Sequence, residues 1–214
     1  MDLNNLVLLT IITSFGTLLM RVLYILRKIY AQQNRLTVEK KSLKVILCIG
    51  SGGHTTELLK IVAQMNLKKY SPRLYMMADS DNNSETKIIS TEKDTKDYQI
   101  CKIPRSRNVH QPYMTSIFST LHAILYCVLP IFRFRPDVII CNGPGTCIPI
   151  CFVVFLMRCF CILDCRIVFI ESLCRVRTLS LSGKILQFIA DIFVVQWPQL
   201  HSVSWRSMYF GRLT

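Results

Sequence analysis

A glycine-rich segment with one histidine is the part of the sequence best suited to chemistry. It lies between an apolar run, Lys44–Gly50, and an amphipathic stretch, Thr55–Met65, and comprises Gly50, Ser51, Gly52, Gly53, His54 and Thr55. Glycines let a backbone turn tightly and approach a ligand, and the free N–H groups at a helix start attract phosphate. The segment matches neither the G-x-G-x-x-G fingerprint nor a P-loop, so a plain strand-to-helix turn is the alternative. The histidine has three open roles: general base, phosphate ligand or helix cap.

Polar residues also follow three other apolar runs that read as strands. Arg105 follows one run, Asn142, Gly143, Gly145 and Thr146 follow a second, and Glu171, Ser172 and Arg175 follow a third. The second and third groups each have a plain alternative, namely a loop with Thr146 as helix cap and a structural ion-pair cluster around Glu171. Parallel sheets bind ligands beyond the carboxyl ends of their strands. The convergence of four such segments therefore predicts a site for an anion, such as a diphosphate, at that edge.

An alternation of strand-like and helix-like segments is needed to bring these residues together. The expected strands are Lys44–Gly50, Arg73–Asp79, Tyr98–Ile103, Asp137–Asn142, Arg166–Glu171 and Ile192–Trp197. The expected helices are Thr55–Met65, Pro112–Phe132, Thr146–Leu163 and Leu181–Ala190, whereas Asp81–Asp97 reads as a loop or a loose helix. Continuous apolar strands alternating with helices predict an α/β fold, a Rossmann-like parallel sheet with helices on both faces, over residues 44–214.

The N-terminus predicts a single transmembrane helix. No charged residue occurs from Leu3 to Met20, a length close to the roughly 20 apolar residues that a bilayer requires. Asp2 precedes the apolar run and the basic residues follow it, which disfavours a cleaved signal peptide. The positive-inside rule then places the following domain in the cytosol. We expect an anchor at residues 1–28 and a polar linker at residues 29–43.

A second apolar run, Ile148–Phe160, has two readings. Its length and composition also suit a membrane span, but Arg158 interrupts it and it lies between two expected strands. A buried crossover helix is the favoured interpretation, and a face that dips into the membrane stays open.

The composition limits the kinds of partner and site. The chain of 214 residues has a net charge of +13, 51% hydrophobic residues and a mean hydropathy of +0.35. The basic residues are not interleaved with aromatic ones as in a nucleic-acid groove, so no nucleic-acid partner is expected. Many of the ten cysteines lie in apolar runs and lack paired C-x-x-C spacing. They are interpreted as reduced core residues of a cytosolic domain, and no metal or cofactor is expected.

Several motifs resemble one known family. VILCIGSGGHTTELL, IPRSR, DVIICNGPGTCIPI, ESLCRVRTLSLSGKIL and IFVVQWP are similar to the membrane-anchoring subunits of the UDP-N-acetylglucosamine transferase of the dolichol pathway. More widely, the chain resembles the N-terminal, acceptor-side half of MurG-like (GT-B) transferases. The resemblance implies that Gly50, Gly52, Gly53 and His54 lie near the acceptor diphosphate, and that Asn142, Gly143 and Gly145 line the interdomain cleft. It also implies that Tyr209–Leu213 ends the domain.

The same resemblance implies partners, a reaction and a location. The transferase adds the second GlcNAc to dolichol-diphosphate-GlcNAc at the cytosolic face of the endoplasmic reticulum membrane. This chain would be a non-catalytic subunit that recruits a small catalytic subunit, which binds the UDP-sugar, into an obligate heterodimer.

Two other functions compete with this expectation. A self-sufficient nucleotide-binding enzyme would be a dehydrogenase or a complete GT-B transferase. This chain lacks the glycine pattern of a dehydrogenase, although Asp79 fits the acidic residue that closes the second strand in such enzymes. A complete GT-B enzyme needs a second Rossmann domain, for which the chain is too short. A membrane scaffold would leave the glycine loops without a role.

Overall fold

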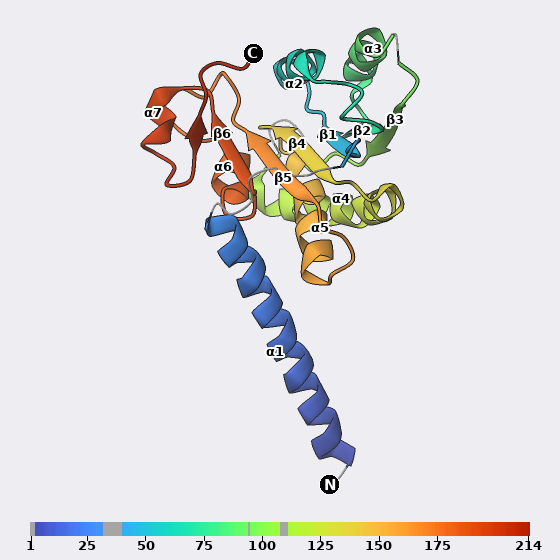
Figure 1. The fold of residues 1–214 in the computed structure, drawn as a ribbon, viewed down its shortest axis with the longest axis vertical. Coiled ribbons are helices and arrows are strands. Elements are labelled where there is room, and N and C mark those ends of the chain that lie inside the picture. The colour runs from blue at the N-terminus through green and yellow to red at the C-terminus, as the bar shows by residue number, and fades with distance from the viewer. Residues whose placement is uncertain (1–2, 32–39, 94, 108–110) are drawn as a thin grey trace.

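A computed structural model describes residues 3–31, 40–93, 95–107 and 111–214 (Figure 1). A long helix, α1 (Leu3–Tyr30), projects from an α/β body that contains the rest of the described chain (Figure 1). Most side chains of α1 are exposed and apolar, and the helix is long enough to cross a membrane. It continues past Lys28, where the anchor was predicted to end. Most of the predicted linker, residues 32–39, lies outside the described residues.

The body is built on one parallel sheet of seven strands. They are β1 (Val45–Cys48), β2 (Arg73–Ala78), β3 (Tyr98–Ile103), β4 (Val138–Asn142), β5 (Arg166–Ile170), β6 (Ile192–Val195) and β7 (Met208–Tyr209). Their order is β3-β2-β1-β4-β5-β6-β7, and all neighbours pair in parallel. The strand order reverses direction between β1 and β4, which is the point where doubly wound sheets bind ligands.

Helices cover both faces of the sheet. On one face lie α2 (Gly53–Gln64) and α3 (Asn82–Thr91), and on the other lie α4 (Tyr113–Phe134) and α5 (Cys147–Cys159) (Figure 1). Side chains alternate along each strand, so Ile46 packs with α4 and α5 while Leu47 packs with α2. Two short helices, α6 (Leu181–Leu186) and α7 (Pro198–His201), complete the body.

The predicted fold class and strands are confirmed, and the differences are local. The segment Asp81–Asp97 contains a regular helix, α3, because the Asp81 carboxylate caps it by accepting from the Ser84 N–H. The helix expected at Leu181–Ala190 ends earlier, and neither α7 nor β7 was predicted. The run Ile148–Phe160 forms the crossover helix α5 between two parallel strands, as favoured.

The inner end of α1 is fixed to the body. Ile25 and Ile29 are buried against Cys159 at the end of α5. The Arg206 guanidinium donates to the Ile29 carbonyl at 3.0 Å, and the Tyr30 ring meets Trp205 edge-on at 5.2 Å between centroids. The C-terminal part of α1 is therefore part of the folded body rather than a free tether.

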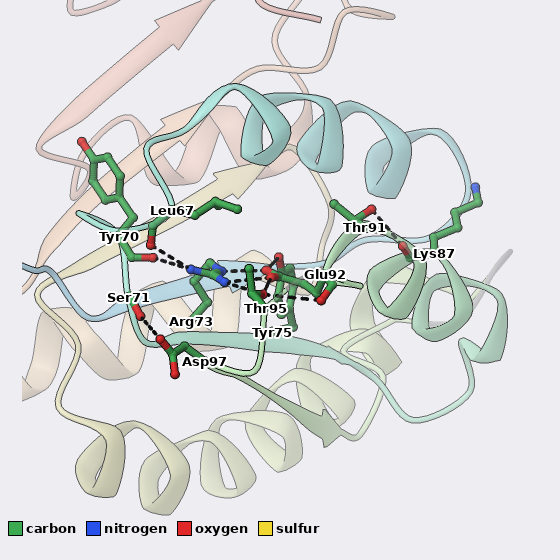
Figure 2. Close-up of polar contacts among 10 residues, drawn as sticks. All are labelled: Leu67, Tyr70, Ser71, Arg73, Tyr75, Lys87, Thr91, Glu92, Thr95 and Asp97. Atoms are coloured by element: carbon green, nitrogen blue, oxygen red, sulfur yellow. Dashed lines mark hydrogen bonds and ion pairs between the residues drawn. The ribbon is translucent and has the colours of Figure 1, made fainter.

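A buried ion pair joins the start of β2 to the end of α3 (Figure 2). Arg73 donates to both carboxylate oxygens of Glu92, at 2.6 and 2.7 Å, and Tyr75 donates to the same carboxylate. Both charged side chains are 1% exposed. Burial alone would raise the pKa of Glu92, but the hydrogen bonds from Arg73, Thr95 and Tyr75 outweigh it and lower that pKa. Within this network the buried charged groups form hydrogen bonds with protein atoms in place of water, as buried ion pairs require.

A second buried pair explains the arginine inside the apolar helix α5. Arg158 donates to both carboxylate oxygens of Asp191, at 2.7 and 3.0 Å, and both side chains are almost fully buried. Asp191 also accepts from the Ile167 N–H. The arginine thus binds the segment just before β6 instead of marking a membrane boundary.

The cysteines are free thiols, and most are buried. The sulfur atoms of Cys48, Cys141 and Cys147 lie within 4.8 Å of one another in the core. Burial raises the pKa of all three thiols, which favours the neutral form over the thiolate that a metal binds. This environment supports the interpretation of these cysteines as core residues.

Candidate functional site

Two loops meet at the switch point of the sheet, one after β1 and one after β4. Gly50 lies so close to the second loop that a Cβ there would stand 2.6 Å from the Cβ of Pro144 and 2.8 Å from that of His54. Gly52 has a φ of 62° and a ψ of −116°, a combination that glycine adopts far more readily than residues with a side chain. These glycines therefore let the two loops pack against each other and turn the chain into α2.

The loops line a cleft of about 400 Å³, called here the switch-point cleft. An adjoining hollow of about 410 Å³ shares part of its wall. The residues common to both are His54, Gly143, Arg175 and Ser180. The cleft thus lies at the carboxyl edge of the sheet, where the site was predicted.

His54 is held by a buried asparagine. Its Nδ1 atom lies 3.2 Å from the Oδ1 of Asn142 at the end of β4, and Asn142 is fully buried. In this arrangement Nδ1 donates to the amide oxygen, which leaves Nε2 as a proton acceptor. The Nδ2 atom of Asn142 has no hydrogen-bond partner among the described residues. The reversed amide would donate to Nδ1 and place the ring proton on Nε2.

Three cationic side chains line the same cleft as the histidine. Arg105 and Arg107 come from the loop after β3, and Arg175 comes from the loop after β5; all three line the cleft. The Arg105 guanidinium also donates to the Ser51 hydroxyl at 3.4 Å. Guanidinium groups recognise phosphate oxygens through paired N–H donors. The cleft is therefore suited to an anion of phosphate or diphosphate type.

Glu171 serves the loop before α6 instead of facing the cleft. Its buried carboxylate accepts from the Ser180 N–H at 3.0 Å and from the Ser180 hydroxyl at 3.1 Å. It also accepts from the Ser172 N–H. Burial raises the pKa of Glu171, although these hydrogen bonds oppose the shift. A side chain at Gly183 would clash with this carboxylate, so the loop and α6 close tightly around it.

The structure brings most of the predicted residues together. The residues that line the cleft are Gly50, Ser51, His54, Arg105, Gly143, Gly145, Thr146 and Arg175. Gly53 and Ser172 line the adjoining hollow. Thr55 is buried and donates to the Gly50 carbonyl, so it shapes the loop from behind, while Asn142 and Glu171 support the site as described. The exposed Gly52 lines neither cavity.

Sequence reasoning missed several polar residues of the cleft. Ser116 and Thr120 reach it from the first turns of α4, and Ser106, Ser180 and Ser182 add further hydroxyls. The signal available for the first two was a hydroxyl pair at helical spacing in a very apolar helix. Glu57 lines the adjoining hollow and accepts from the Ser172 hydroxyl and the Leu173 N–H. No local pattern links α2 to a loop that lies 115 residues later.

Comparison with known proteins identifies the family of this chain. The family model described as "Oligosaccharide biosynthesis protein Alg14 like" matches residues 45–213. UDP-N-acetylglucosamine transferase subunit ALG14 of Homo sapiens is 44% identical over 183 residues, covering 81% of this chain and 84% of the human one. The Rattus norvegicus subunit of the same name is 41% identical and covers 96% of this chain and 98% of its own length.

Solved structures share the fold at low sequence identity. Acinetobacter baumannii MurG superposes with a TM-score of 0.57 at 14% identity, over 79% of this chain but only 45% of the MurG chain. A UDP-N-acetylglucosamine 2-epimerase superposes with a TM-score of 0.51 at 12% identity, over 73% of this chain and 41% of its own. The family match spans almost the entire body and the relatives align over most of their length, so this chain belongs to the Alg14-like family of oligosaccharide biosynthesis proteins.

Proposed function

We propose that this chain is the membrane-anchoring, acceptor-side subunit of a heterodimeric UDP-GlcNAc transferase. The complex adds the second GlcNAc to dolichol-diphosphate-GlcNAc, in the synthesis of the lipid-linked oligosaccharide for protein N-glycosylation. The chain recruits a small cytosolic catalytic subunit to the endoplasmic reticulum membrane. Its relatives are named as subunits of a UDP-N-acetylglucosamine transferase, which supports the reaction class.

The switch-point cleft is the observation that carries this proposal. It combines Arg105, Arg107 and Arg175 with glycine backbone and His54 at the start of α2. Guanidinium groups and helix N–H groups both favour the charges of a diphosphate. We infer that the diphosphate of the acceptor lies against the arginines, with the sugar hydroxyl directed toward His54.

The size of the chain supports a divided active site. The chain covers less than half of the MurG chain that it resembles in fold. A GT-B enzyme binds its two substrates between two Rossmann domains, and the body described here contains one sheet. The partner therefore supplies the half that binds the UDP-sugar, and this chain is inactive alone.

The topology of the chain follows from α1 and its flanking charges. We propose that the anchor predicted at residues 1–28 lies within α1, that the linker predicted at residues 29–43 begins only after Tyr30, where α1 ends, and that residues 44–214 form a cytosolic domain. The apolar side chains along α1 and the basic residues after it support this orientation.

Membranes from cells that coexpress the full chain and the small partner provide the test. We expect GlcNAc transfer from UDP-GlcNAc to dolichol-diphosphate-GlcNAc only when both chains are present. Arg105→Ala should lower transfer and raise the acceptor KM, whereas Lys68→Ala, an exposed cation remote from the cleft, should change neither. Transfer by this chain without a partner, or an Arg105→Ala complex with normal acceptor affinity, would overturn the proposal.

A further inference from the structure

The outer side of α4 is an apolar stripe that the body leaves exposed. The exposed side chains include Met114 at 75%, Phe118 at 74% and Leu125 at 70%. Ile117, Leu121, Val128, Leu129 and Phe132 continue the stripe at helical spacing. Soluble monomeric proteins rarely expose a contiguous apolar patch of this kind unless it binds a partner or a membrane.

The inner side of the same helix belongs to the core. Ala123, Cys127 and Ile131 are fully buried, and the last two lie in the core cluster beneath the sheet. The helix also provides the crossover between β3 and β4, which lie in one parallel sheet. It is long and apolar enough to cross a membrane, but spanning would remove its inner side from the core. The geometry therefore excludes a span while this fold is intact and leaves the outer side to be covered.

The apolar surface is continuous with the membrane anchor. Helices α4 and α5 cover the side of the sheet from which α1 projects, and α2 and α3 cover the opposite side (Figure 1). Phe152 on α5 and Phe160 just after it are exposed, and the helix packs against both α4 and α1. The surface thus begins where α1 leaves the body and extends across α5 to α4.

The charged residues of α4 and those nearest to its two ends are all basic. The sequence contains no Asp or Glu between Asp97 and Asp137, and its basic residues there are Lys102, Arg105, Arg107, Arg133 and Arg135. Arg133 and Arg135 are exposed at the end of α4, while Arg105 and Arg107 precede its start. An apolar helix face flanked by basic residues is the pattern of helices that lie in the interface of an anionic membrane.

We propose that the outer sides of α4 and α5 lie in the interfacial layer of the bilayer that α1 enters, with α4 parallel to the membrane plane. Ser116 and Thr120, in the first turns of α4, line the switch-point cleft. The mouth of the cleft is thereby held at the lipid surface, where a lipid-linked diphosphate can enter without leaving the membrane. The membrane contact follows from the exposed apolar surface beside α1, and only its use for the acceptor rests on the proposed function.

Labelling by photoactivatable phospholipids tests the contact in the full chain. The chain is reconstituted in nanodiscs that contain anionic lipid, without acceptor or UDP-GlcNAc, and the labelled peptides are identified by mass spectrometry. One lipid carries its diazirine near the headgroup and a second carries it at the acyl end. We expect α4 peptides to react with the shallow probe and not with the deep one, and α1 peptides to react with both.

Two variants separate a lipid contact from general exposure. Phe118→Glu/Leu125→Glu should reduce shallow labelling of α4 by about tenfold, because carboxylates disfavour burial at the interface, while labelling of α1 stays unchanged. Ile89→Glu, at a half-exposed position of α3 on the opposite side of the sheet, should leave the labelling of both α4 and α1 unchanged.

Several results would overturn the proposal. They are an α4 that stays unlabelled in the wild-type chain while α1 reacts, an α4 that reacts with the deep probe as a span would, and a stripe that cross-links to protein instead of lipid. Labelling is read without transfer activity, so failure of the proposed function leaves this test intact.

Discussion

The hydrogen bond between His54 and Asn142 decides what the histidine offers to a ligand. With Nδ1 as donor to Oδ1, the free Nε2 accepts a proton and suits a general base. With the amide reversed, Nε2 carries the proton and suits a diphosphate oxygen. Both forms need Asn142 buried behind the ring, which explains why a side chain that lines neither cavity still belongs to the site.

Replacement of His54 distinguishes the two roles. If His54 is the base, His54→Ala in the assembled complex should lower kcat by about 10²–10⁴-fold with little change in acceptor KM. If it only binds the diphosphate, the loss should be about 1 kcal/mol and should appear first in KM. Steady-state kinetics with varied acceptor would measure both parameters. A variant complex with wild-type kcat and KM would show that the loop is only a turn.

Gly50→Val tests the packing of the two loops. The added side chain would meet Pro144 and His54 at less than van der Waals distance, so the loops must separate. We expect transfer to fall strongly while the chain remains in the membrane and bound to its partner, as shown by co-purification from solubilised membranes. Gly16→Val, at a position in α1 with open space around it, is the matched control and should retain transfer. Normal transfer by Gly50→Val would show that the close contact is not required.

Sequence patterns located the residues that belong to motifs but not those that support them. The glycine loop, Arg105 and the Asn142 loop were found because each follows a strand, and parallel strands end at one edge. The supporting role of Glu171 depends on a bond to Ser180 across a turn, and that of Glu57 on a contact between distant segments. Pairings of this kind have no local periodicity and become visible only when the chain is folded.

At the scale of elements, the Arg73–Glu92 network fixes the polar helix α3 to β2. From composition, the segment Asp81–Asp97 could be predicted only as a loop or a loose helix, because it contains few apolar residues. The structure shows that a cap at Asp81 and a buried ion pair at the other end stabilise it instead (Figure 2). Propensity alone does not include these tertiary interactions, which is why the strongly apolar helices were predicted better than this one.

Glu92→Gln should destabilise the chain in a pH-dependent way. At pH 7 the change leaves Arg73 buried beside a neutral amide, at a cost of about 3 kcal/mol in the free energy of unfolding. The pKa of Glu92 is lowered in the folded state, so its contribution is present above the unfolded pKa of about 4.3 and is lost as the pH falls through the folded pKa. The difference between variant and wild type should therefore shrink below about pH 4.

Thermal unfolding of the full chain in detergent, followed by tryptophan fluorescence, would measure this effect. Glu85→Gln is the matched control on the same helix, because Glu85 forms a partly exposed ion pair with Lys102. Such pairs contribute about 1 kcal/mol or less. Equal destabilisation by the two variants at pH 7 would contradict the importance assigned to the buried pair.

At the scale of the whole molecule, α1 has two parts with different surroundings. Its outer part is exposed and apolar, whereas Leu18, Val22, Ile25 and Ile29 pack against the end of α5. Hydropathy revealed the anchor but not this docking, because the same apolar residues suit lipid and a protein surface. Removal of residues 1–28 would also remove much of the docking surface, so a truncation that tests membrane attachment must end earlier.

Removal of residues 1–17 leaves the docked part of α1 in place but makes the apolar helix too short to span. We expect this shortened chain to leave the membrane in alkaline carbonate, which releases peripheral proteins, yet still to float with vesicles of anionic lipid through the outer sides of α4 and α5. Adding Phe118→Glu/Leu125→Glu should abolish flotation, and adding Ile89→Glu should not. Because neither change touches the buried side of a helix, near-ultraviolet circular dichroism should remain that of the folded body. A folded shortened chain that fails to float at low salt, with its stripe intact, would mean that α1 alone holds this protein at the membrane.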